Sequence, residues 1–102
     1  MDLMIIPMST GEYVLQIRSE RLTTDHRVDV PVRLLDELGL PRDRAKDVIA
    51  RSVDWFRDRG EDLPALVDLG VRWDGEPGFR QFLADQLSED GRVGTAAAEA
   101  RT

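Results

Sequence analysis

The side chain best suited to proton transfer is His26, the single histidine, which stands in the segment Thr-Thr-Asp-His-Arg. An imidazole can act as a general base near neutral pH, and Asp25 or Asp29 could orient it. No recognisable nucleophile motif accompanies this histidine. The four serines stand in ordinary contexts: Ser9, Ser19, Ser52 and Ser88. We therefore expect His26 to be a structural residue at the start of a strand, and we expect no catalytic residues.

The sequence also contains no motif for metal binding or for phosphate binding. The sequence contains no cysteine, no paired histidines and no His-x-x-Glu spacing, so we expect no metal ligands. The segment 74–78 (Asp-Gly-Glu-Pro-Gly) lacks the lysine and the glycine spacing of a phosphate-binding loop. Its glycines are expected to shape a turn. The sequence therefore predicts neither an enzyme nor a bound cofactor.

The side chains most suited to contact a partner protein are tryptophan and arginine, which are favoured at interfaces. Trp55 lies at the edge of an apolar helix stripe, one turn after Arg51, a spacing that allows a cation–π contact. Trp73 lies in a segment rich in turn formers, and either tryptophan could equally belong to the edge of the core. Arg18 and Arg27 are expected to point outward from two neighbouring strands. The partner-binding candidates are Arg18, Arg27, Trp55 and Trp73.

Charge and composition narrow the range of partners. The 102 residues include 14 Lys and Arg against 20 Asp and Glu, for a net charge of −6. An acidic protein is repelled by nucleic acid and by anionic membranes, so both are disfavoured as partners. No apolar run approaches the roughly 20 residues of a membrane helix, and the short run 3–6 follows Asp2, unlike a signal peptide. The lack of cysteine and the preference for arginine over lysine lead us to expect a bacterial, cytoplasmic protein.

Two predicted strands are the first structural elements that would position the candidate residues. Apolar and polar residues alternate over 12–19 and again over 26–30, with a polar turn region between them. This pattern predicts an antiparallel hairpin at residues 12–30. A two-stranded sheet is marginal by itself, so its open edge is expected to be completed by residues 3–8 or by a second copy of the chain. Residues 1–8 are otherwise expected to be flexible.

Helices are predicted for the rest of the chain. A short helix over 31–38 begins at Pro31 and ends at Gly39, and a long amphipathic helix over 43–59 takes Asp43 as its N-cap. Its apolar stripe is Ala45, Val48, Ile49, Ser52, Val53 and Phe56. Further along, we expect a short helix at 63–70, a turn at 73–78 and a final helix that starts near Phe79 and ends near Gly91.

Strands followed by helices predict an α+β fold in which the long helix lies across the hairpin. One domain is expected over residues 1–91, with two or three short helices beside the long one. Residues 92–102 contain no large apolar residue beyond Val93, so we expect a disordered tail.

Residues 26–59 resemble the ribbon-helix-helix fold of bacterial repressors and antitoxins. In that family a strand leads into a Pro-started helix, and a second helix with an apolar stripe follows. Residues 28–30 would form the ribbon, 31–38 the first helix and 43–56 the second. The resemblance implies a dimeric DNA-binding regulator or antitoxin, because each subunit gives one strand of the ribbon. The strand at 12–19, however, offers this ribbon a partner within its own chain.

The sequence as a whole favours a small, non-enzymatic module for protein interaction or regulation. Its partner would be another protein or a second copy of the chain, and the open edge of the hairpin is the natural place for strand addition. The ribbon-helix-helix regulator is the alternative. A small-molecule-binding protein is a third hypothesis, because an apolar pocket leaves no motif.

Overall fold

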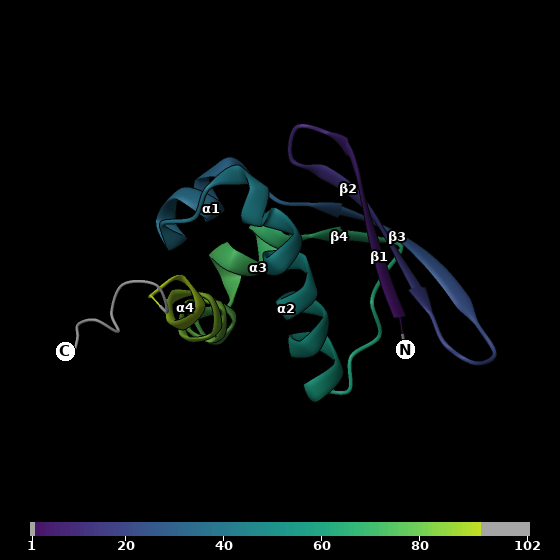
Figure 1. The fold of residues 1–102 in the computed structure, drawn as a ribbon. Helices are drawn as coiled ribbons and strands as arrows, with labels where there is room; N and C mark the ends of the chain where they lie inside the picture. Colours follow the sequence, from purple (N-terminus) through teal and green to yellow (C-terminus); the bar gives the residue numbers. More distant parts are fainter. Residues whose placement is uncertain (1, 93–102) are drawn as a thin grey trace.

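The computed structural model describes the backbone of residues 2–92 and the side chains of residues 2–87, and it confirms the predicted α+β class. The tail predicted at 92–102 is wrong at its first residue, because Arg92 is the last residue of α4, and positions 93–102 lie outside the described residues. All four helices gather on one side of a twisted sheet (Figure 1). The elements in chain order are β1 (Asp2–Ser9), β2 (Glu12–Arg18), β3 (Thr23–Asp29), α1 (Val32–Leu38), the 3₁₀ turn η1 (Arg42–Arg44), α2 (Ala45–Asp58), β4 (Leu66–Asp68), α3 (Leu69–Gly75) and α4 (Pro77–Arg92).

The sheet contains the predicted hairpin and extends it on both sides, but the second strand begins at Thr23, so the prediction that His26 starts this strand is wrong. Its strand order is β1-β2-β3-β4, with antiparallel pairing from β1 to β3. Residues 2–9 provide the third strand that was one of the two expectations for the open edge. In the middle of the sheet Leu15 lies opposite both Ile5 and His26. Between β1 and β2 the chain turns at Gly11, whose φ of 77° is a conformation that side chains other than glycine rarely adopt.

The prediction of a helix at 63–70 is wrong. Leu66–Asp68 form β4, which pairs in parallel with β3 and places Val67 beside Val28, both buried. The backbone amide of Arg27 donates to the carbonyl of Ala65 over 2.8 Å at the start of this pairing. The free edge of β3 supplies these hydrogen bonds, and β3 is distant in sequence. Local periodicity therefore could not predict a strand here.

The prediction of a turn at 73–78 is wrong except at Glu76, the single residue between α3 and α4. Residues 73–75 form the last turn of α3, which begins directly after β4. Asp68 stabilises this start because its carboxylate accepts hydrogen bonds from the amides of Gly70 and Val71, at 3.0 and 3.3 Å. The chain then passes into α4 at Pro77, two residues before the expected Phe79, and α4 extends to Arg92. With 16 residues, α4 is longer than α2, which has 14.

The first two helices follow the sequence closely. Pro31 precedes α1, and Gly39 ends it in the left-handed conformation with φ of 72°. The predicted N-cap of the long helix is wrong, because Asp43 lies inside η1 and Arg44 occupies the cap position without a side-chain cap. The 3₁₀ turn runs straight into α2, so no free cap position remains at residue 43. The predicted stripe of α2 is confirmed, since all six of its residues are buried.

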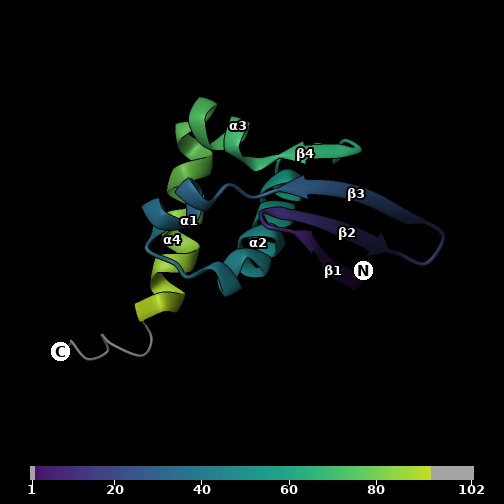
Figure 2. The same cartoon turned by 90° about the horizontal axis from the view of Figure 1, so that it is seen from above.

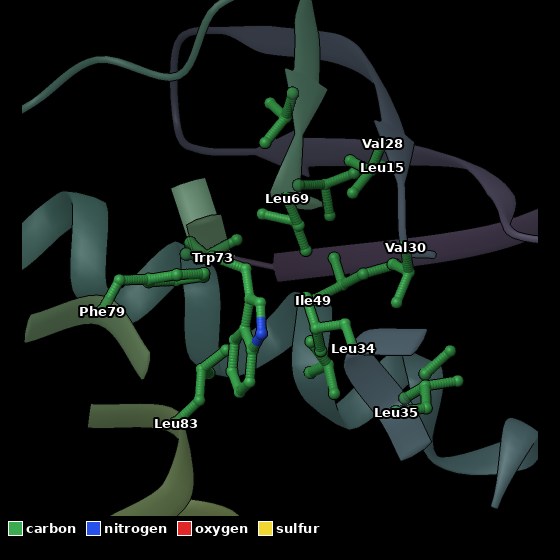
Figure 3. Close-up of a cluster of buried hydrophobic side chains, with 14 of the residues drawn as sticks. Leu15, Val28, Val30, Leu34, Leu35, Ile49, Leu69, Trp73, Phe79 and Leu83 are labelled. Atoms are coloured by element: carbon green, nitrogen blue, oxygen red, sulfur yellow. The ribbon is translucent and has the colours of Figure 1, made fainter. Parts of the chain in front are cut away.

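The hydrophobic core lies between the inner face of the sheet and the helices (Figure 3). Leu15 and Val28 approach it from the sheet, Ile49 from α2 and Leu34 from α1. The third and fourth helices close it from the far side with Leu69, Trp73, Phe79, Leu83 and Leu87. Burial of each large side chain contributes about 1.5–3 kcal/mol, so α4 is a major source of stability although it comes last in the sequence. None of the helices in residues 2–92 is long and apolar enough to span a bilayer.

Candidate functional site

The sheet has an outer face that the described part of the chain leaves uncovered. Strand alternation and register place these side chains on it: Asp2, Met4, Ile6, Glu12, Val14, Gln16, Arg18, Thr23, Asp25, Arg27, Asp29, Leu66 and Asp68. One row crosses all four strands as Ile6, Val14, Arg27 and Leu66. Met4 is 51% exposed and Leu66 is 59% exposed. In Figure 2 α2 lies behind the strands, and α1, α3 and α4 lie beyond the strand ends, so the described helices leave these apolar groups exposed to solvent.

The two arginines predicted to bind a partner both belong to this outer face. Arg27 contacts Glu12 across the hairpin with a long N–O distance of 3.8 Å. Such an exposed pair contributes less than about 1 kcal/mol and can exchange partners easily. Arg18 lies opposite Asp2 in the register and makes no ion pair with the described acidic side chains. The structure thus brings Arg18 and Arg27 to one surface, as outward-facing cations.

Trp73 lies apart from this surface. Its side chain is 5% exposed, and it packs within the core near Phe79 and Leu83 (Figure 3). The indole Nε1 donates to Oε1 of Glu37 over 3.2 Å, which gives its only polar atom a partner. Trp73 therefore has little surface left for another protein.

Trp55 lies between α2 and α4 and is half-buried. Its ring meets Phe79 and Phe82 with centroid distances of 5.7 and 5.5 Å. The cation over the ring is Arg59, at 4.8 Å, whereas the expected Arg51 pairs with Asp54 instead. The expected Trp55–Arg51 contact is therefore wrong. The four predicted partner-binding residues do not come together, because only the two arginines share the outer face.

The outer edge of the sheet is formed by β1, whose far side has no partner strand in the described chain. From Leu3 to Met8 this strand carries only apolar residues. Pro7 lacks a backbone N–H, and the register shifts between Pro7 and Ser9. Proline and a bulge hinder edge pairing at that end. Residues 3–6 remain as an apolar edge with a regular register, open to another strand.

His26 lies on the opposite, inner face and is 8% exposed. Its Nδ1 is 2.7 Å from the carbonyl oxygen of Pro64, and its Nε2 is 3.0 Å from Oγ1 of Thr24. A carbonyl can only accept, so Nδ1 must carry a proton. In the neutral ring Nε2 then accepts, and the Thr24 hydroxyl donates to it. This arrangement ties β3 to the segment between α2 and β4.

Sequence reasoning missed Thr24 and Pro64 as partners of His26 and considered the two neighbouring aspartates instead. Asp25 points to the outer face, where it accepts from Gln16 over 3.1 Å, and Asp29 lies one residue beyond Val28 on that same face. The spacing of two residues between Thr24 and His26 was the available signal, since residues i and i+2 of a strand share a face. Pro64 is 38 residues away, so nothing local indicated it.

A groove of about 430 Å³ opens beside His26, between the end of the β2–β3 hairpin and the second half of α2. Its walls are mostly apolar: Ile17, Leu22, Val53, Phe56 and Leu63. The polar lining residues are Thr24, His26, Arg57, Glu61 and Asp62. This size is within the range of small-ligand pockets, which are typically about 300–1,000 Å³.

A second hollow of about 400 Å³ lies where the parallel strands β3 and β4 end. Across it Arg33 donates two hydrogen bonds to Asp74, both of 2.8 Å. These bonds lower the pKa of the Asp74 carboxyl and raise that of Arg33. The two charges satisfy each other at an exposed position, which marks a surface clamp between α1 and α3.

Neither hollow contains the ligand set of a metal site. No three histidine, aspartate or glutamate side chains in the described residues come together so that they could hold a metal ion. Comparison with protein-family models, curated proteins and solved structures finds no match for this chain. Function is therefore argued from the geometry of the sheet surface and the grooves.

Proposed function

We propose that this chain is a protein-interaction module that acts by strand addition at β1, with a second copy of the chain as the partner. The observation that supports this proposal is the uncovered apolar edge at residues 3–6 and the outer face beside it. A long apolar edge strand would otherwise favour uncontrolled pairing. The absence of cysteine fits our expectation that the module acts in the bacterial cytoplasm.

The sequence of β1 is compatible with two-fold antiparallel pairing. A register centred on Met4 sets Met4 against its own copy and Leu3 against Ile5 of the second copy. In this register the outer side chains of both copies lie on the same face of the combined sheet. The reason is that side chains alternate between the two faces with a period of two residues, and the pairing keeps this alternation in step. Asp2 would lie beside Ile6 of the second copy, so no like charges oppose each other. Pro7 stays outside this ladder, where its missing N–H costs nothing.

The alternative ribbon-helix-helix regulator receives no support from the arrangement of the strands. In that family the ribbon pairs with the ribbon of a second subunit. Here β3, which contains the ribbon residues 28 and 29, is paired on both sides by β2 and β4 of its own chain. Asp29 lies opposite both Glu12 of β2 and Asp68 of β4, and these three carboxylates form a surface that repels phosphate.

Light scattering at several protein concentrations tests the proposal directly. We expect a mass near twice 11.5 kDa that falls toward the monomer on dilution. Ile6→Lys should weaken the dimer about tenfold or more, because it puts a charge into the apolar contact while the side chain stays solvated in the monomer. Arg18→Glu should weaken it less, by placing a second carboxylate beside Asp2.

The matched control is Val71→Lys, which puts the same charge at a 66% exposed apolar position on α3, away from β1. Far-UV circular dichroism confirms that each variant is folded. A monomeric wild type at every concentration, or equal loss of the dimer in Val71→Lys and Ile6→Lys, would show that β1 is not the interface.

A further inference from the structure

We propose that the groove beside His26 binds small cationic amines that carry an apolar body, a function separate from strand addition at β1. The groove combines an apolar wall with a few converging polar groups, as small-molecule sites do. Its floor comes from the sheet and α2, both of which are regular elements. Its rim comes from the segment between α2 and β4, at residues 61–63.

The apolar wall determines the body of the ligand. Val53 and Phe56 are 3% and 1% exposed, so they present only their groove-facing edges. Leu22 is 63% exposed at the mouth of the groove and has apolar surface left to cover. An aromatic or short aliphatic group would remove this surface from water, at about 25 cal/mol per Å² of apolar area.

The hydrogen bonds of His26 determine the kind of polar group that fits. Nδ1 donates to the Pro64 carbonyl, so Nε2 of the neutral ring accepts the hydroxyl proton of Thr24. The Thr24 oxygen then has only lone pairs to offer to a ligand. The Thr24 oxygen is therefore available to a ligand as a hydrogen-bond acceptor. It favours a ligand group that donates a hydrogen bond.

The charges around the groove favour a cation over a neutral donor. Arg57 is 2.7 Å from Asp54, a carboxylate that also pairs with Arg51, and Oε1 of Glu61 is 3.3 Å from Nη1 of Arg72, which also pairs with Glu76. Asp62 makes no ion pair with the described basic side chains and is exposed at the rim. The charged side chains that line the groove, Arg57, Glu61 and Asp62, sum to one negative charge beside the Thr24 acceptor. An ammonium group has three donors and the charge to satisfy both.

The test compares three probes with the same aromatic body: 2-phenylethylamine, 2-phenylethanol and phenylacetate. Each is titrated into the full chain at the same pH and ionic strength. Amide shifts in ¹H–¹⁵N spectra report the binding site and the affinity. We expect saturable shifts at Ile17, Thr24 and Leu63, with the amine about fivefold tighter than the alcohol and the carboxylate weakest.

Asp62→Asn should remove most of the preference for the amine and leave the affinity for the alcohol unchanged. The control Asp58→Asn makes the same charge change at an exposed position of α2 that does not line the groove. Thr24→Val should weaken the amine and the alcohol together. The proposal is overturned by shifts that do not saturate up to about 10 mM, by shifts away from the groove, by equal affinities for the three probes, or by equal effects of Asp58→Asn and Asp62→Asn.

Discussion

Replacement of His26 by phenylalanine should destabilise the fold although it adds apolar surface to a nearly buried position. The change removes two hydrogen bonds, of 2.7 Å to Pro64 and 3.0 Å to Thr24, and keeps a flat ring in place. A neutral hydrogen bond contributes about 0.5–1.5 kcal/mol net, and an acceptor left unpaired in the interior costs about 1–3 kcal/mol. Pro64 is exposed and Thr24 half-buried, so water can reach both. We therefore expect a loss of about 1–2 kcal/mol in the free energy of unfolding.

Urea unfolding followed by far-UV circular dichroism measures this loss, provided that the slope with denaturant is unchanged. Thr24→Val is the matched control, because it removes only the Nε2 contact and should cost less than about 1 kcal/mol. Hydrogen exchange adds a local measurement. The backbone amide of Arg27 donates to the carbonyl of Ala65. In His26→Phe its exchange should accelerate by more than the loss in the free energy of global unfolding explains, because the nearby hydrogen bond to Pro64 is absent.

Two results would refute this reasoning. An unchanged or increased stability of His26→Phe would show that the two contacts do not stabilise the fold and that apolar burial outweighs them. An equal loss in Thr24→Val and His26→Phe would assign the whole effect to Nε2, and the Pro64 bond would then have no role in holding the segment between α2 and β4.

Other predictions concern the core, a turn and the charged clamp. Leu83→Ala, at a fully buried position of α4, should lower the free energy of unfolding by about 2–5 kcal/mol in the same urea assay. Gly11→Ala should cost about 1–2 kcal/mol, because φ is +77° and the new Cβ would lie 3.1 Å from the Val30 carbonyl oxygen; no loss would contradict the turn geometry. Arg33→Gln should raise the pKa of Asp74 toward its ordinary 3.8, measured by NMR titration, because the arginine hydrogen bonds that lower it are lost. In the wild type the stabilisation from this pair is present above pH 3.8 and is lost as the pH falls through the lowered pKa, so acid unfolding of Arg33→Gln should differ from wild type above that range and converge below it.

The sequence by itself determined the elements whose signals are local. The alternation over 12–19 predicted β2, and the six-residue apolar stripe of α2 is buried as its helical period required. Pro31 and Gly39 marked the ends of α1, because proline suits a first turn and glycine suits the left-handed cap. The outward direction of Arg18 and Arg27 also followed from strand alternation alone.

The tertiary structure decided the features that depend on residues distant in the chain. Leu66–Asp68 became a strand because β3 offered a free edge, and its apolar run fits a helix or a strand equally well. His26 and Thr24 share a strand face, but the proton on Nδ1 is placed by Pro64, 38 residues away. The uncovered face of the sheet likewise exists because α2 lies behind the strands and α1, α3 and α4 lie beyond the strand ends. Local propensity carries no information on such pairings, since they form only when the chain brings separate segments together.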